Sequence, residues 1–221
     1  RVATRVLQAF PHSFPEGVAA RWTGNPIRRE IAGLAEPAGA DASRQLHLLV
    51  IGGSQGAQAL NENLAPALAL FEPAQRPEVR HQAGRGKLEM TRAAYAAHQV
   101  EATVSEFVDD MAEAYRWADL VVCRAGALTV SELMAAGVAS VLVPYPFAVD
   151  DHQTVNASFL SEAGAALLLP QAELNAARLH ALLDSLLADR ARLLQMAQAA
   201  YALAKRDAAA VVADACEELA A

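Results

Sequence analysis

The stretch LHLLVIGGSQGAQAL (Leu46–Leu60) joins an apolar run, a glycine-rich turn and the start of a helical pattern. This is the order in which a buried strand turns into a helix in α/β proteins. Within it, GGSQG (residues 52–56) also matches G-x-S-x-G, the pattern in which serine hydrolases place their nucleophile. The same turn can cradle a phosphate, because backbone N–H groups at a helix start point at an anion. Ser54 is therefore either a nucleophile or a phosphate contact.

An alternation of strands and helices continues from this stretch towards the C-terminus. Apolar segments of strand length occupy His47–Ile51, Val79–Gln82, Thr103–Phe107, Asp119–Cys123, Ser140–Val143 and Ala165–Leu169. Apolar stripes between and after them predict helices, with Leu60, Leu64, Leu68 and Phe71 in one and Leu179, Leu182, Leu183 and Leu186 in another. The sequence therefore predicts an α/β fold, a doubly wound, Rossmann-like parallel sheet, over residues 45–221.

Residues 1–44 differ in composition from the rest of the chain. Proline, glycine and small polar residues punctuate the segment, which predicts a linker or hinge with one short helix near Arg28–Leu34. The chain begins with Arg1, so we expect either a processed start or a piece of a longer protein.

The composition predicts a well-packed globular protein. Of 221 residues, 54% are hydrophobic and 19% are charged, and the net charge of −7 argues against nucleic acid as a broad electrostatic partner. The two cysteines, Cys123 and Cys216, match no metal-ligand spacing, which favours a reducing compartment. No apolar run reaches the roughly 20 residues that a membrane-spanning helix needs.

A hydrolase and a nicotinamide-binding enzyme are both poorly supported. A hydrolase needs an acid and a histidine after the nucleophile, yet His180 lies beside an apolar stripe as a solvated helical position. His152 lies in a loop, but the acids before it, Asp150 and Asp151, are adjacent in sequence, which is poor geometry for a triad. The run GGSQGA lacks the order G-x-G-x-x-G that dinucleotide-binding folds use.

A second strand-to-helix loop favours the phosphate interpretation. In VVCRAGALTVSE (Val121–Glu132), Arg124, Ala125 and Gly126 turn the chain into a helix that begins near Ala127. Both loops would direct N–H donors at the same crevice, at the carboxyl ends of the strands. One helix start contributes only about 0.3–1 kcal/mol to an exposed anion, so two that converge on a diphosphate make better sense than either alone.

Five motifs carry a resemblance to a known family. GNPIR (24–28), GGSQGA (52–57), EFVDDM (106–111), CRAGALTVSE (123–132) and DDHQTVNA (150–157) occur in this order and at this spacing. The chain resembles the C-terminal half of the MurG family, peptidoglycan glycosyltransferases of the GT-B fold. The family moves N-acetylglucosamine (GlcNAc) from UDP-GlcNAc to the lipid-linked muramyl-pentapeptide, lipid I. The resemblance covers the whole chain, and the family's N-terminal domain is missing from it.

The resemblance implies roles in donor binding for the matched residues. Arg28 and Ser54 would face the diphosphate of UDP-GlcNAc, with Gly53 and Gln55 beside Ser54. Backbone groups of Val108 would contact the uracil edge.

Glu132 would accept hydrogen bonds from the ribose hydroxyls, and Ala127, Leu128 and Thr129 would line the helix start against the donor phosphates. His152 and Gln153 match the pair that contacts the sugar hydroxyls, although His152 stands where some relatives have glutamine. Ser54 is thus expected to be a phosphate contact, and no catalytic residue is expected in this half.

On this resemblance the chain supplies the donor-binding half of an inverting hexosyltransferase and needs no cofactor or metal. Its partners would be UDP-GlcNAc and, through the missing N-terminal domain, lipid I and the membrane surface, at the cytoplasmic face of the bacterial inner membrane. Two alternatives remain open. The chain could be a stand-alone UDP-sugar-binding subunit that acts with a partner chain. It could also be a UDP-GlcNAc epimerase-like enzyme, which would carry extra acidic and histidine residues near the second loop, where only Glu132 is present.

Overall fold

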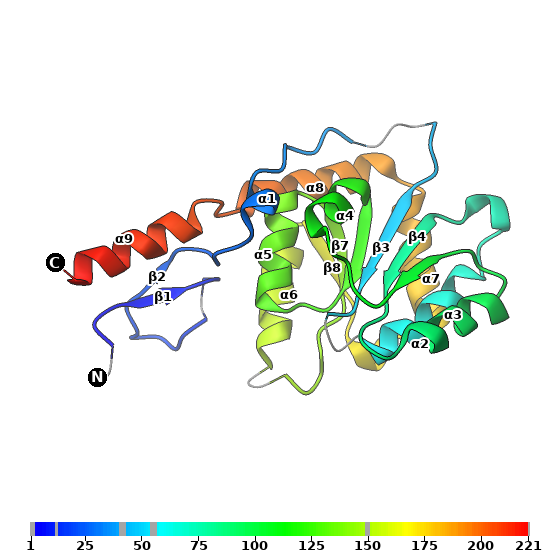
Figure 1. The fold of residues 1–221 in the computed structure, drawn as a ribbon, viewed down its shortest axis with the longest axis horizontal. Helices are drawn as coiled ribbons and strands as arrows, with labels where there is room; N and C mark the ends of the chain where they lie inside the picture. The colour runs from blue at the N-terminus through cyan, green and yellow to red at the C-terminus, as the bar shows by residue number, and fades with distance from the viewer. Residues whose placement is uncertain (1–2, 12, 40–42, 54–56, 149–150, 221) are drawn as a thin grey trace.

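A six-stranded parallel sheet forms the centre of the molecule, with strand order β5-β4-β3-β6-β7-β8 (Figure 1). The computed structural model describes residues 3–11, 13–39, 43–53, 57–148 and 151–220. The strands are β3 (His47–Ile51), β4 (Glu78–Gln82), β5 (Thr103–Ser105), β6 (Leu120–Cys123), β7 (Ala139–Leu142) and β8 (Ala166–Leu168). All neighbouring strands in this sheet are parallel, so the predicted doubly wound sheet is confirmed.

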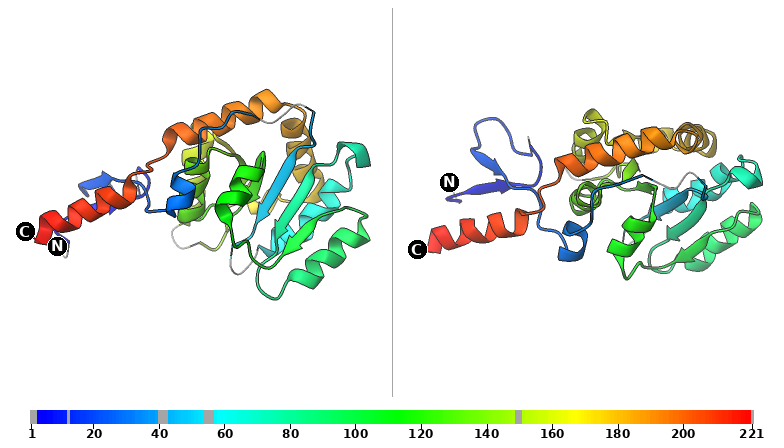
Figure 2. Two further views of the ribbon diagram at one scale, coloured as in Figure 1. Left: turned by 45° about the horizontal axis from the view of Figure 1, so that its top comes forward. Right: turned by 90° about the horizontal axis from the view of Figure 1, so that it is seen from above.

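Helices cover both faces of the sheet because successive strand residues point to opposite sides. Leu48 and Val50 belong to one core, and Leu49 and Ile51 belong to the other. The first core is closed by α2 (Gln58–Leu68), α3 (Leu88–Ala97) and α7 (Ala176–Leu187), and the second by α1 (Arg29–Ala32), α4 (Met111–Trp117), α5 (Ala127–Ala136) and α6 (His152–Glu162). Helix α8 (Arg190–Leu203) contributes to both, and Figure 2 shows it crossing the top of the sheet. Single 3-10 turns occur at Pro73–Gln75 and Gln171–Glu173.

The predicted apolar stripes are the inner faces of α2 and α7. Leu60, Leu64 and Leu68 have no exposed surface, and neither do Leu179, Leu183 and Leu186. His180 corrects one expectation, because its ring packs edge-on against Phe71 with the centroids 4.3 Å apart, so it is half-buried and not solvated. The end of α2 and the middle of α7 meet there, which removes His180 from any role at the sheet edge.

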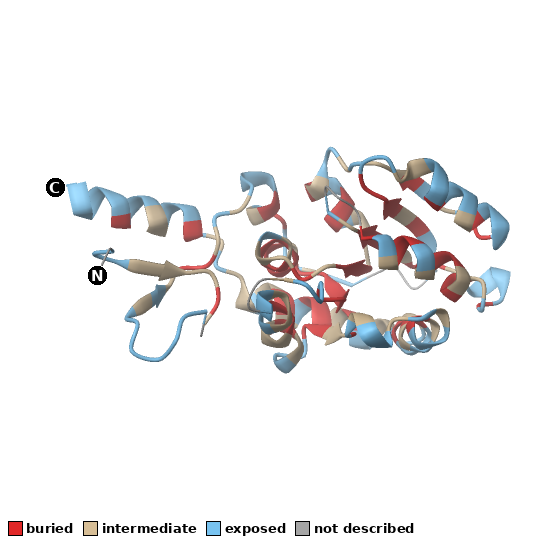
Figure 3. Ribbon diagram, turned by 90° about the horizontal axis from the view of Figure 1, so that it is seen from below, coloured by how far each residue is buried: buried red, intermediate tan, exposed pale blue. Residues whose placement is uncertain are grey.

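The N-terminal segment and the last helix form a separate small layer. Strands β1 (Val6–Gln8) and β2 (Ala20–Trp22) pair in parallel, and helix α9 (Ala208–Ala220) lies alongside them, away from the six-stranded sheet (Figures 1 and 2). Arg5 and Glu218 form an ion pair between the two, and the Lys205 ammonium lies 4.3 Å from the Trp22 ring centre. Figure 3 shows this layer as mostly exposed or intermediate. The sequence predicted helix α1 but not the two strands, because both are short, contain a polar residue and are only partly buried.

Candidate functional site

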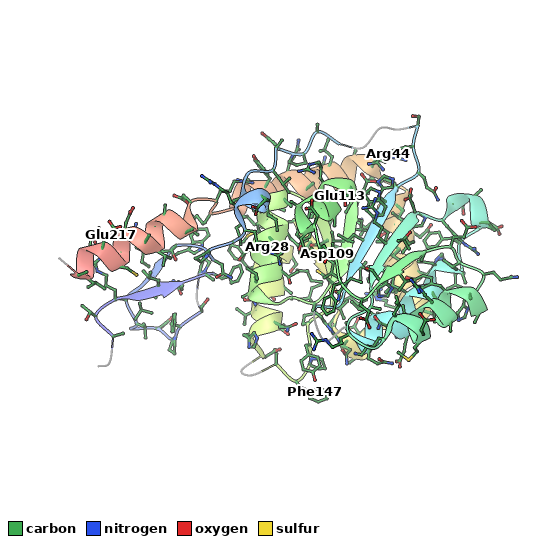
Figure 4. The ribbon with its side chains drawn as sticks, viewed as in Figure 1. Arg28, Arg44, Asp109, Glu113, Phe147 and Glu217 are labelled. Carbon is green, nitrogen blue, oxygen red and sulfur yellow. The ribbon has the colours of Figure 1, made fainter. Side chains whose placement is uncertain are left out.

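The order of strands reverses between β3 and β6, at the centre of the sheet. Successive strands run outward through β4 and β5 on one side and through β7 and β8 on the other. Open α/β sheets bind ligands outside the carboxyl ends of their strands at such a point. In Figure 4, Arg44 marks the amino-terminal edge of the sheet and Phe147, which follows β7, marks the carboxyl-terminal edge. The candidate site lies at the latter edge.

The β3 loop (residues 52–57) and the β6 loop (residues 124–126) both end in a helix start at this edge. Ala57 and Gly126 occupy the N-cap positions of α2 and α5, and neither has a side chain that could cap the helix. The first-turn N–H groups of α2 and α5, which follow the neighbouring strands β3 and β6, therefore face the edge where the strand order reverses, an arrangement suited to an anion.

A cavity of about 920 Å³ opens between these loops. Its described walls include Gly52, Gly53 and Gln153, with three cations, Arg85, Lys87 and Arg124, and one carboxylate, Glu62. The chain as a whole carries a net charge of −7, so the positive character is local to this cavity. Its volume lies within the range of about 300–1,000 Å³ that is usual for ligand pockets. A second cavity, of about 270 Å³, lies at the opposite edge of the sheet beneath residues 34–39.

Gly53 has a backbone conformation that favours glycine. Its φ is +76°, in the left-handed region, and a Cβ built there would meet nothing within 4 Å. Glycine is therefore favoured by the backbone conformation of the turn and not by lack of room for a side chain. Ser54 and Gln55, which follow it, lie outside the described residues.

Glu132 is a buried carboxylate on α5 with one unmatched oxygen. It is 4% exposed, and the Tyr115 hydroxyl donates a 3.2 Å hydrogen bond to Oε2. Oε1 has no hydrogen-bond partner among the described residues, and the Arg28 Nε lies 3.7 Å from it. Burial raises the pKa of Glu132 above its ordinary value, while Arg28 and the Tyr115 hydroxyl act against that rise. This oxygen keeps unused capacity to accept a hydrogen bond, but its atom is fully buried and Glu132 is not among the described residues that line the cavity.

The structure thus brings Arg28 and Glu132 together, two residues predicted to contact different parts of the donor. Leu128 and Thr129 lie on the first turn of α5, after Ala127, with Leu128 46% exposed and Thr129 in the cavity wall. Val108 lies beyond β5, half-buried against the second core. The predicted strand Thr103–Phe107 ends at Ser105, so the residues before Val108 form a loop.

Helix α6 begins with His152 and Gln153 beside the loop that follows β7. Gln153 Oε1 accepts a 3.0 Å hydrogen bond from the Tyr145 N–H, and Gln153 also lines the cavity. His152 is exposed and is not among the cavity-lining residues. Asn156 orients the helix, since its Nδ2 donates to the Ala125 carbonyl in the β6 loop at 3.0 Å.

Four residues that contact the loops or the predicted residues of this site were not predicted to take part in it. Gln82 joins two of the loops, Arg85 lies in the glycine-rich turn after β4, and Tyr115 supports Glu132. Arg124 donates to the carbonyls of Val143 and Pro144 and lies over the Tyr145 ring, so it holds the loop after β7. The run AGRGK (83–87) carried a usable signal, because it is a third glycine-rich turn between a predicted strand and a helix.

The described part of the chain holds neither a cluster of metal-ligating side chains nor a helix suited to span a membrane. Within the described ranges, no cluster of three or more His, Cys, Asp or Glu side chains could hold a metal ion. Among the helices that the structure describes, none is both long and apolar enough to cross a membrane.

Residues 47–212 match the family model "Glycosyltransferase family 28 C-terminal domain". The chain is 53% identical to the UDP-N-acetylglucosamine–N-acetylmuramyl-(pentapeptide) pyrophosphoryl-undecaprenol N-acetylglucosamine transferase of Nitrosococcus oceani, over 99% of this chain and 62% of that protein. It is 56% identical to the protein of the same name from Aromatoleum aromaticum, over 96% of this chain and 58% of the relative. The chain thus spans about three fifths of the length of these relatives.

Among solved structures, Acinetobacter baumannii MurG is similar to this chain, with a TM-score of 0.82 and 42% sequence identity. The match covers 98% of this chain and 61% of that one. The resemblance seen in the five motifs is confirmed, and the chain belongs to the glycosyltransferase family 28 C-terminal domain family.

Proposed function

We propose that this chain is the donor-binding half of an enzyme that transfers GlcNAc from UDP-GlcNAc to the lipid-linked muramyl-pentapeptide. The observation that carries the proposal is the pair of helix starts at the point where the strand order reverses, with a basic cavity between them. Two relatives that are more than half identical to the chain are named as transferases of this kind. Because the chain spans three fifths of their length, the reaction itself belongs to the whole protein.

In the proposed complex, the diphosphate lies against the starts of α2 and α5, with Ser54, Gly53 and Gln55 on one side and Ala127, Leu128 and Thr129 on the other. Arg28 adds a fixed positive charge. Glu132 accepts hydrogen bonds from the ribose through Oε1, the oxygen to which no described residue donates a hydrogen bond. Backbone groups of Val108 contact uracil, and Gln153 with His152 contacts the sugar.

The protein's contribution to the chemistry is stabilisation of the leaving group. The acceptor hydroxyl attacks the anomeric carbon as the bond to the UDP oxygen breaks, so negative charge grows on the diphosphate. Preset N–H groups and cations hold that charge without having to reorganise. The group that removes the proton from the acceptor hydroxyl belongs to the absent half, as do the contacts with lipid I.

The small layer of β1, β2 and α9 is proposed to belong to the hinge and to the other domain. A two-stranded sheet is marginal by itself, and parallel strands are normally covered on both faces. Leu219 of α9 is 51% exposed, and Phe14 and Val18, in the connection between β1 and β2, are 43% and 42% exposed. Contact with the remaining part of the protein would cover these side chains. An undecaprenol-linked acceptor would be reached at the cytoplasmic membrane surface through that part.

Nucleotide binding and transfer, measured separately, test this function. We expect the 221-residue chain to bind UDP and UDP-GlcNAc in calorimetry and not ADP, and to transfer no radiolabelled GlcNAc to lipid I by itself. Orienting the acceptor can lower the activation barrier by up to about 7–11 kcal/mol. In this proposal, the surface that orients the acceptor belongs to the other domain. Transfer should return when the N-terminal half is added. Equal binding of ADP and UDP, or strong transfer by this chain alone, would refute the proposal.

A further inference from the structure

Gln82 lies at the carboxyl-terminal end of its strand, between the loops that follow the two neighbouring strands. It is the last residue of β4, which lies between β3 and β5. In the strand register it is level with Ile51 of β3 and Ser105 of β5. The chain leaves the sheet immediately after each of these partners, into the β3 loop and into the β5 loop (residues 106–110). A side chain at this position can therefore reach two loops that are far apart in sequence.

The Gln82 amide uses both of its ends on these loops. Its Oε1 accepts from the Gly52 N–H at 3.1 Å, and its Nε2 donates to the Gly53 carbonyl at 2.9 Å. The same Nε2 donates to the Glu106 carbonyl at 2.8 Å. One N–H donor faces Oε1 and two carbonyls face Nε2, so the backbone groups define which way the amide points. The residue is only 4% exposed.

Another hydrogen bond connects the β5 loop to the loop that follows β4. Glu106 Oε1 accepts from the Gly86 N–H at 2.7 Å, which joins the β5 loop to the glycine-rich turn that carries Arg85. Through Gln82 and Glu106, the loops that follow β3, β4 and β5 are linked by hydrogen bonds to one another. Gln82 and Glu106 do not line the cavity, so their side chains leave its surface available to a ligand.

We propose that Gln82 is a positioning residue that sets the β3 loop and the β5 loop at one fixed separation. The inference rests on the proposed function, in which the β3 loop holds the diphosphate and the β5 loop holds uracil. The base and the diphosphate of one nucleotide are joined through the ribose, so both loops must lie at the matching distance before they can bind together. Preset loops avoid the ordering cost that mobile ones incur on binding.

Two variants of Gln82 test this role in the 221-residue chain, with UDP as the probe. Gln82→Met keeps the length of the side chain and removes all three hydrogen bonds. Calorimetry well below the melting temperature should show UDP binding weakened by about 10- to 100-fold, which corresponds to two lost or misplaced contacts. Gln75→Met is the matched control, because Gln75 is exposed in the turn at Pro73–Gln75, and it should bind UDP as the wild type does.

The Gln82→Glu variant gives a second measurement, the pH dependence of UDP affinity, which should not change if Gln82 acts only on stability. Its carboxylate cannot donate to the carbonyls of Gly53 and Glu106, whereas its protonated form can donate to one of them. The ratio of variant to wild-type affinity for UDP should therefore recover as the pH falls from about 8 to about 5.5, since burial raises a carboxyl pKa into this range. His81 and Glu106 lie beside this position in both proteins, so the ratio compares proteins that differ only at residue 82.

The outcomes separate this inference from the proposed function. If the wild-type chain binds no UDP, the proposed function fails. If the wild type binds UDP and a folded Gln82→Met variant binds it equally well, Gln82 does not position the loops. A Gln82→Glu ratio that stays constant with pH would also overturn the inference. So would failure of both variants to fold at either pH, because Gln82 would then act on stability alone.

Discussion

Replacing Glu132 with glutamine should stabilise the ligand-free chain and weaken its binding of UDP. The carboxylate is buried, Tyr115 donates one hydrogen bond to Oε2, and no described residue hydrogen-bonds to Oε1. Without a ligand, this buried carboxylate lowers the free energy of unfolding. With UDP bound, it strengthens binding by accepting hydrogen bonds. Glutamine keeps the shape of the side chain and removes the charge.

The expected gain in stability is the difference between two effects. An unmatched buried polar atom costs about 1–3 kcal/mol when neutral and more when charged, and the variant replaces a charged atom with a neutral one. The variant loses the 3.7 Å ion pair with Arg28, whose side chain is 52% exposed. An exposed pair of this kind contributes only about 0–1 kcal/mol. We therefore expect a net gain of about 1 kcal/mol in the free energy of unfolding. This gain corresponds to a melting temperature about 2–4 °C higher for a domain of this size.

The gain should depend on pH in a defined direction. Burial raises the pKa of Glu132 above the ordinary value of 4.5, against the opposing effects of Arg28 and Tyr115. The native state therefore holds this proton more tightly than the unfolded state, and stability falls as the pH rises from 4.5 through the raised pKa. The Gln variant has no such carboxyl. Its advantage should be full above that window and absent below it.

Thermal melts at several pH values, with and without saturating UDP, measure both effects. Without ligand, Glu132→Gln should melt above the wild type at neutral pH. The order should reverse when UDP is bound, because the ribose hydrogen-bonds to the unmatched carboxylate oxygen only in the wild type. Glu89→Gln is the control, since the Glu89 side chain is 83% exposed on α3 and should change neither value. A variant that melts below the wild type at neutral pH without ligand, or no reversal with UDP, would refute the reasoning.

Two further substitutions distinguish binding from packing. Ser54→Ala should weaken UDP-GlcNAc binding by about 5- to 150-fold, the effect of one lost hydrogen bond to a charged group. The whole enzyme should keep measurable turnover, and a covalent adduct at Ser54 would show a nucleophile instead. Leu183→Ala, in the fully buried face of α7, should lower the free energy of unfolding by about 2–5 kcal/mol in urea titrations. Its UDP affinity at low temperature should stay unchanged, and a tenfold loss would place α7 in the site.

The sheet could be predicted from sequence because its signals are local. The central strands β3, β6 and β7 are mainly apolar runs of four to five residues ended by a turn, and a buried parallel strand needs little else. β1 and β2 were missed for the opposite reason. They are three residues long, only partly buried, and paired with each other across an intervening segment, so nothing within either stretch distinguishes it from a loop.

The same division applies to the candidate site. Gly53 could be found because its role depends on its own backbone, which has a positive φ where other residues are strained. Arg28 and Glu132 stay predictions from their motifs, and their mutual contact could not be predicted from sequence. Tyr115 lies on α4 in an ordinary helical pattern, and its part at the site exists only because α4 packs against α5.

Gln82 shows why pattern alone stops short of the site. At the end of a strand, a polar residue is usual wherever the chain emerges into solvent, so its type carries no information. Its significance comes from the strand order, which places β4 between the two strands whose loops it joins. If β4 lay at the edge of the sheet, the same amide could reach one loop and would face water on its other side. The position that makes Gln82 important is therefore a property of the topology, and a substitution there should act on the ligand through loops that are themselves unchanged in sequence.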